Sequence, residues 1–431
     1  MYKTKAAQVF VNKYRFVKIL YTYFIGQGLL QMINLLNGFY IIRWLDFENQ
    51  AKFTLALGMF STISFFSDLG FGGTLLSLVG SDIDNKEVVG KYISGIRYYK
   101  NKLIVLSILV SSVVATVFYT RQNWGFEFIC VYIFILIGAL CQSSMGYYAA
   151  VIQAKGELRA YYKPQIIVSI LRFSISYLMV KVFTLDVIVA VALISLGSLY
   201  STYSLKQYAR RYYSEITPIT DVVKSEIIKT IAPIIPMSIL FIIQGQVGMF
   251  LIGYYANYKT IAEVGALSRL GQFFSLLTPF TSIVLLPYFA KSTVSTIATR
   301  SIITVVISLL ITLPFIVVAY TTPKFYLIVL GDKFKQLDYL VGMFFVSVSI
   351  NYISGIVWAI IFARKLSRWH FSIVSIIATV FVQTVCIINI PLSTTQGIIL
   401  FTLWTYLTSL VLNLIICTIG IFKLSNQLKI V

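Results

Sequence analysis

The sequence predicts an all-α integral membrane protein with about 12 transmembrane helices in two pseudo-symmetric six-helix halves. Three observations point to this class. The chain of 431 residues is 58% hydrophobic and only 12% charged, against about 25% charged residues in a soluble domain. Twelve of its apolar runs are long enough to cross a bilayer, which takes about 20 residues. One stretch near the start also returns, in weaker form, in the second half.

The repeated stretch covers residues 37–80, and its copy covers residues 249–287. At an offset of 211 residues, Asp46 falls on Asn257. Twice this offset nearly equals the length of the chain. Tandem halves of this kind build many secondary transporters.

The apolar runs divide evenly between the two expected halves, residues 1–205 and residues 229–431, which a polar cytoplasmic loop at 206–228 connects. The expected spans are 17–42, 52–80, 101–120, 124–151, 164–183, 185–205, 229–255, 261–290, 300–322, 336–363, 370–390 and 396–422.

The distribution of Lys and Arg predicts the orientation. With the N-terminus inside, inner segments carry 25 of the 35 Lys and Arg residues and outer loops carry 8, whereas Asp and Glu divide 7 to 7. A bias confined to Lys and Arg is the positive-inside pattern, so both termini are expected to be cytoplasmic. Because these cations lie in short loops between apolar runs, the net charge of +20 indicates contact with membrane lipid and no nucleic acid.

Catalytic and metal-binding patterns are absent from the sequence. The four cysteines lie in apolar runs without metal-type spacing, the single histidine is His370, and there is no phosphate-binding glycine loop. We therefore expect no enzyme, no metal and no cofactor. A proton or sodium gradient stays open as an energy source.

Polar residues recur at helical spacing within two of the expected spans. The first span carries Gln31 and Asn34, and the fifth carries Gln165, Ser169 and Arg172. Lipid cannot pair with such groups, so these stripes should face other helices or a wet interior. We take Gln31 and Asn34 as candidate substrate-binding residues, while interhelical packing hydrogen bonds remain an alternative.

Three charged residues lie well inside the spans, away from their ends: Arg172, Arg269 and Asp68. Each costs about 2.5 to 3.5 kcal/mol at a span centre, which pairing or hydration must offset. Arg172 either lines a cavity or has a structural partner such as Asp68, and Arg269 lines the cavity or reaches the surface. Asp68 is a candidate proton or sodium site, with a helix-fixing ion pair as the alternative. Two arginines against one aspartate favour a diphosphate or acidic sugar as substrate.

Two short motifs carry a resemblance to a known family. The run Ser67–Gly72 reads SDLGFG, and Ala232–Pro236 opens the seventh span with two prolines. With them the whole chain resembles the polysaccharide transporter (Wzx-type O-antigen and capsule flippase) family of the multidrug, oligosaccharidyl-lipid and polysaccharide exporter superfamily. Twelve spans depart from the fourteen typical of peptidoglycan lipid flippases.

The resemblance implies a MATE-like fold and a role in polysaccharide or lipopolysaccharide biosynthesis. It implies movement of an undecaprenyl-diphosphate-linked oligosaccharide to the outer leaflet of a bacterial cytoplasmic membrane, with a polymerase and assembly proteins as further partners. By analogy with the family's cationic lumen, Arg172 and Arg269 would contact the head group, and Lys181 and Arg121 would lie at the outer mouth.

Two other functions remain open from the sequence. The first is a cation-coupled multidrug or metabolite exporter of the same fold. The second is a non-transporting scaffold in a polysaccharide assembly complex.

Overall fold

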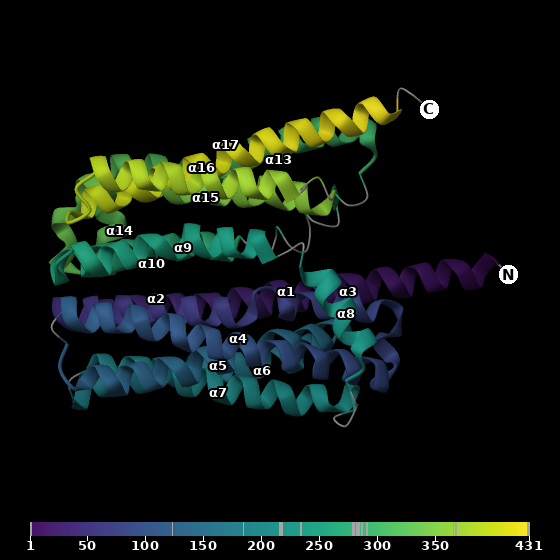
Figure 1. Ribbon diagram of the computed structural model, residues 1–431, viewed down its shortest axis with the longest axis horizontal. Coiled ribbons are helices and arrows are strands. Elements are labelled where there is room, and N and C mark those ends of the chain that lie inside the picture. The colour runs from purple at the N-terminus through teal and green to yellow at the C-terminus, as the bar shows by residue number, and fades with distance from the viewer. Residues whose placement is uncertain are drawn as a thin grey trace. The chain divides into compact units, whose positions relative to one another are not determined.

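The computed structural model is helical throughout its described part, and those residues contain no strand (Figure 1). The structure describes residues 2–428 except 123, 184, 215–218, 233–234, 278–280, 282–284, 286–287, 290–291, 365 and 367–368. Pro233, which belongs to one of the two motifs above, therefore lies outside the described residues.

The helices follow one another with short connections. Up to residue 231 they are α1 (Tyr2–Trp44), α2 (Phe47–Asp68), α3 (Phe71–Val79), η1 (Gly80–Asp84), α4 (Lys86–Arg121), α5 (Glu127–Ala154), α6 (Leu158–Val182), α7 (Val187–Ala209), η2 (Arg210–Tyr212) and α8 (Asp221–Ile231). Beyond it they are α9 (Ile235–Tyr255), α10 (Tyr258–Gly271), η3 (Gln272–Leu276), α13 (Val294–Thr321), α14 (Pro323–Leu330), η5 (Asp332–Leu337), α15 (Asp338–Ala363), α16 (Trp369–Asn389) and α17 (Thr395–Leu428).

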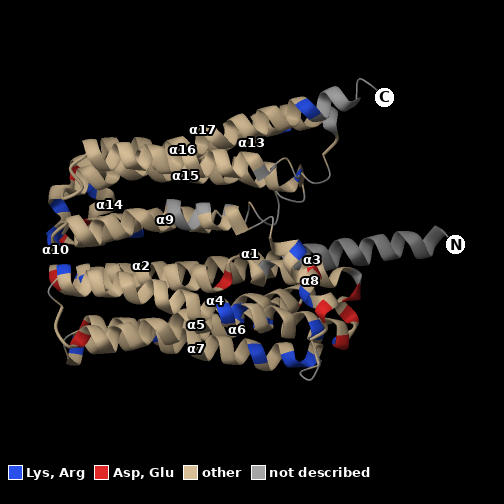
Figure 2. Ribbon diagram, in the orientation of Figure 1, with Lys and Arg blue, Asp and Glu red and all other residues tan. Residues whose placement is uncertain are grey.

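Each of the twelve apolar runs overlaps a helix. Eight helical segments in the described part are long and apolar enough to cross a membrane. Figure 2 shows that charged residues gather near helix ends and that the long middle stretches carry few of them. The prediction of an all-α, multi-span protein is confirmed.

The second expected span, residues 52–80, is two helices instead of one. Helix α2 ends at Asp68, and α3 begins at Phe71. Between them Leu69 and Gly70 adopt positive φ angles of 41° and 88°. A left-handed backbone stops a helix, and for leucine it is strained. The run Ser67–Gly72, noted in the sequence as a family motif, therefore contains the break between α2 and α3.

Contacts group the chain into two compact units. Unit 1 comprises residues 1–40, 59–113 and 126–234, and unit 2 comprises residues 41–58, 114–125 and 235–431. Unit 2 thus takes in the α1–α2 turn and the end of α4 as well as the second half of the sequence. The division into halves at residues 206–228 stays a prediction, and part of that segment is helical, in η2 and α8.

Unit 1 is built around α5, which packs against α7, α3 and α6. Glycines allow its closest approach to α3: a Cβ on Gly72 would lie 3.2 Å from the Cα of Gly146. Only small residues permit backbones to come this near. The short helix α3 is thereby held against α5 directly beyond the break.

Unit 2 contains geometric traces of the internal repeat. The Asp46 carboxylate accepts a 2.7 Å hydrogen bond from the N–H of Asn49, and the Asn257 amide oxygen accepts one of 2.9 Å from Thr260. Both residues cap the start of a helix in the same i to i+3 manner. The two positions that the 211-residue offset aligns therefore have the same structural role, which is to cap the start of a helix.

The same offset relates residues that touch one another. Thr54 on α2 aligns with Gly265 on α10, and a Cβ at Gly265 would overlap the Thr54 side chain. Residues equivalent under a two-fold rotation meet only at its axis. Helices α2 and α10 therefore cross at a local pseudo-two-fold axis inside unit 2.

Two further contacts of unit 2 form an equivalent pair, which we call the end contacts. Gln122 donates through Nε2 to the carbonyl of Ala256 at 3.1 Å, and Lys333 donates through Nζ to the carbonyl of Leu45. Both donors and both acceptors are 211 residues apart. Each carbonyl lies at the C-terminal end of a long helix, where the last carbonyls have no partner within the helix.

Candidate functional site

The two polar stripes expected from the sequence face each other across α1 and α6. Asn34 on α1 accepts through Oδ1 a 2.9 Å hydrogen bond from the Ser169 hydroxyl and another from Nη2 of Arg172, both on α6. One amide oxygen therefore serves two donors. This joins the helices at the depth where the arginine lies.

A polar cavity of about 230 Å³ surrounds this contact within unit 1. Amides, hydroxyls and the guanidinium share its wall with apolar side chains. Its lining residues are Leu30, Asn34, Phe60, Gln142, Met145, Gln165, Val168, Ser169, Arg172, Ile194, Gly197, Ser198 and Ser201. The cavity therefore offers many neutral polar groups and one full positive charge.

Arg172 is incompletely satisfied in this cavity. Its Nε is buried without a hydrogen-bond partner, and across the described residues the side chain makes no ion pair. Guanidinium carries five donors in a fixed fork that suits carboxylate and phosphate oxygens. A buried donor without a partner calls for an explanation, such as a ligand or water. The site thus has spare capacity for an anion.

Asp68 has a different partner from the one considered in the sequence analysis. Lys100 on α4 places Nζ 2.7 Å from Asp68 Oδ1 and also donates to the carbonyl of Ser143 on α5. The lysine lies 5.3 Å from the ring centroid of Tyr147. Lys100 is only 2% exposed. Arg172 is therefore not the mate of Asp68.

Sequence reasoning missed Lys100 because the residue lies at the edge of an expected inner loop, where cations set orientation. The available signal was the aspartate: a carboxylate among apolar residues needs a cation, and the end of the next span is within reach of it.

Asp68 also fixes the helix break. Its Oδ1 accepts a 3.1 Å hydrogen bond from the N–H of Gly72, in the first turn of α3. A carboxylate is favourable at this position because the free N–H groups there carry partial positive charge. The aspartate therefore ties together α2, α3, α4 and, through Lys100, α5.

The remaining predicted residues do not line this cavity. In unit 1, Lys181 is exposed in the last turn of α6, 6.0 Å from the ring centroid of Tyr177. Gln31 is partly buried on α1 but does not line the cavity. Of the six candidate substrate residues, only Arg172 and Asn34 are brought together there.

Arg269 and Arg121 belong to unit 2. Arg269 lies over the ring of Phe53, 5.6 Å from its centroid. Arg121 donates a 2.7 Å hydrogen bond to the Tyr254 hydroxyl and lies over the same ring. Stacking of a guanidinium on an aromatic face is a common use of arginine in proteins.

The described residues contain no group of three His, Cys, Asp or Glu side chains that could hold a metal ion.

No protein-family model matches the sequence. No curated protein sequence matches it either.

Solved structures do resemble it. An inward-facing multidrug resistance MATE family transporter of the MOP superfamily is similar with a TM-score of 0.68 at 13% identity, over 94% of this chain and 96% of that one. The MATE multidrug transporter DinF-BH gives 0.65 at 13% identity over 95% of each chain. The lipid II flippase MurJ, in an inward closed conformation, gives 0.64 at 13% identity over 93% of this chain and 87% of that one.

These likenesses define the class of the molecule by fold. The chain has the fold of MATE transporters, as the sequence resemblance implied. MurJ has a similar fold, so the fold by itself admits drugs and lipid-linked substrates alike.

Proposed function

We propose that the protein is a flippase that moves an undecaprenyl-diphosphate-linked oligosaccharide, an O-antigen or capsule repeat unit, from the cytoplasmic to the outer leaflet by alternating access. We place it in a bacterial cytoplasmic membrane with both termini inside. It works without catalytic chemistry or a bound cofactor, alongside a polymerase and assembly proteins. The likeness to the lipid II flippase MurJ supports a lipid-linked substrate.

The observation that carries the proposal is Arg172. It is a guanidinium in a polar cavity, with a buried unpaired Nε and, among the described residues, only a neutral amide oxygen as its partner. Keeping such a charge in a membrane costs several kcal/mol unless something recovers it. A diphosphate that passes through the cavity would supply the missing acceptors in one conformational state. Transport needs such a difference in binding between states.

The supporting experiment reverses this charge in cells that make the polysaccharide. Arg172→Glu should abolish surface polysaccharide while the amount of protein in the membrane stays unchanged. The introduced carboxylate would repel the diphosphate of the substrate in the cavity. Lys324→Glu, at an exposed position outside the cavity, is the matched control and should behave as wild type. Normal surface polysaccharide with Arg172→Glu would refute the proposal.

A second candidate is a cation-coupled multidrug or metabolite exporter, which the likeness to MATE multidrug transporters favours. In that case Asp68 would be the coupling carboxylate, and a proton or sodium ion would have to compete with Lys100 at 2.7 Å. Deletion of an exporter should change drug tolerance, whereas deletion of a flippase should leave tolerance unchanged and remove surface polysaccharide. The variant Arg172→Glu distinguishes a flippase from a scaffold without transport. If the protein is only a scaffold, this variant should leave the surface polysaccharide of the cell intact.

A further inference from the structure

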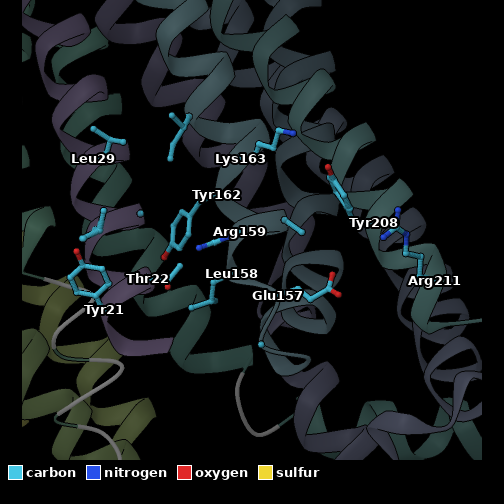
Figure 3. A pocket seen from close by; sticks show the side chains of 15 residues that line it. Tyr21, Thr22, Leu29, Glu157, Leu158, Arg159, Tyr162, Lys163, Tyr208 and Arg211 are labelled. Carbon is cyan, nitrogen blue, oxygen red and sulfur yellow. The ribbon is translucent and has the colours of Figure 1, made fainter. Parts of the chain in front are cut away.

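A second, larger cavity of about 1010 Å³ lies in unit 1, between the middle of α1, the start of α6 and the end of α7 (Figure 3). Pockets of about 300 to 1,000 Å³ hold drug-sized ligands. The Arg172 cavity, about 230 Å³, falls below this range, whereas the larger cavity reaches its upper end. Its lining residues are Tyr21, Thr22, Ile25, Gly26, Leu29, Gly156, Glu157, Leu158, Arg159, Ala160, Tyr162, Lys163, Ile166, Tyr208 and Arg211.

The charge of this wall is positive. Arg159, Lys163 and Arg211 stand against one carboxylate, Glu157, which accepts a hydrogen bond from the Tyr212 hydroxyl. In the described part of the chain, neither Arg159 nor Lys163 makes an ion pair. In Figure 3, Arg159 points toward α1 beside Tyr162.

The position of two of these cations is unfavourable for the helix that bears them. Arg159 and Lys163 lie one turn apart at the start of α6. Like charges at this spacing repel, and cations at a helix N-terminus add to the positive end of its dipole. An anion at this place would relieve both effects.

Another part of the wall is apolar. The side chains of Ile25 and Leu29 on α1 are 49% and 45% exposed, and Leu158 and Ile166 on α6 also line the cavity. The helices approach closely at Gly26, where a Cβ would overlap the Tyr162 ring. The cavity therefore combines cationic side chains with an apolar surface, and this combination is complementary to a lipid with an anionic head group.

We propose that this cavity binds the phosphate head group of an anionic lipid, with its acyl or prenyl chain along α1. The proposal rests on the proposed function in one respect: it makes the diphosphate end of the lipid-linked substrate the preferred ligand, held here before it reaches Arg172. Phosphate oxygens pair with Arg159, Lys163 and Arg211, and the tyrosine rings of the wall offer faces for the first sugar.

The test measures the equilibrium binding of lipids to the full-length purified protein, with native mass spectrometry as the readout. The probes are undecaprenyl diphosphate, phosphatidylglycerol, phosphatidylethanolamine and inorganic diphosphate. Wild type should retain the two anionic lipids at least about tenfold better than phosphatidylethanolamine. The variant Arg159→Gln/Lys163→Gln/Arg211→Gln should lose this preference.

The matched control removes three exposed cations that do not line the cavity, Lys86→Gln/Lys102→Gln/Lys229→Gln, and should bind as wild type. A preference for undecaprenyl diphosphate over phosphatidylglycerol identifies the substrate as the ligand, and equal retention identifies bulk anionic lipid. Unchanged binding by the cavity variant would overturn the proposal, and so would retention of inorganic diphosphate alone.

The result can be read separately from the proposed function because binding needs no transport. If transport fails the test of the proposed function while this binding persists, the cavity is a lipid site on a protein with another activity.

Discussion

Lys100 and Arg172 are both cations inside the same helical unit, and their surroundings differ sharply. Lys100 meets a carboxylate at 2.7 Å, a backbone carbonyl and an aromatic ring. Arg172 meets one amide oxygen and keeps a buried donor unpaired beside a cavity. The comparison teaches that a fully paired charge builds the architecture, whereas a partly paired one is available to a ligand.

The largest expected effect comes from breaking the satisfied pair. Asp68→Asn leaves Lys100 buried without a carboxylate, and removal of one partner of a buried ion pair costs about 3 to 5 kcal/mol. The thermal unfolding midpoint of the purified protein should fall markedly.

The double variant Asp68→Asn/Lys100→Met serves as the control for this prediction. It removes both charges and keeps a side-chain oxygen that can accept from Gly72, so most of the stability should return. An undiminished midpoint in the single variant would show that the pair is not structural.

A smaller effect, on transport, should follow from giving Arg172 a carboxylate partner like that of Lys100. Asn34→Asp places a carboxylate where the amide oxygen now accepts from Arg172. The protein should remain as stable as wild type, while transport should fall about tenfold, because an internal ion pair worth about 1.4 kcal/mol competes with the substrate by that factor. The paired readouts are the unfolding midpoint and the transport rate. Wild-type transport with Asn34→Asp would mean that the guanidinium does not contact the substrate.

The smallest effect is expected at a partly buried cation, Lys333, whose equivalent in the other repeat, Gln122, is neutral. Because Gln122 makes the same end contact without a charge, Lys333→Gln should change the free energy of unfolding by less than about 1 kcal/mol, the net value of one hydrogen bond. Lys333→Leu should cost more, about 1 to 3 kcal/mol, since it leaves a buried carbonyl unpaired. Equal losses in the two variants would show that the charge itself matters.

Much of this architecture was readable from the sequence. Apolar run length and the low share of charged residues predicted a multi-span helical protein. The 211-residue offset paired Asp46 with Asn257, and both residues do cap helices. Helical spacing also placed Asn34 in one polar stripe and Ser169 and Arg172 in another, and the structure shows that these stripes meet.

Other features depend on contacts that periodicity does not encode. The helix break at Leu69 falls within an apolar run that hydropathy predicts as one span. Hydropathy does not report a left-handed backbone conformation such as that of Leu69. The ion pair of Asp68 with Lys100 depends on how α2 lies against α4 and α5, so that a lysine from an expected loop becomes buried. The larger cavity likewise arises where α1, α6 and α7 come together.

The most direct test of the central claim is the transbilayer movement of an undecaprenyl-diphosphate-linked oligosaccharide in proteoliposomes that contain wild type or Arg172→Gln. The account predicts that wild type moves the lipid and that Arg172→Gln moves it at least about tenfold more slowly. The unfolding midpoint should be unchanged, because Arg172 pairs with no carboxylate in the described part of the chain. Equal rates for the two proteins, or no movement by wild type, would contradict it.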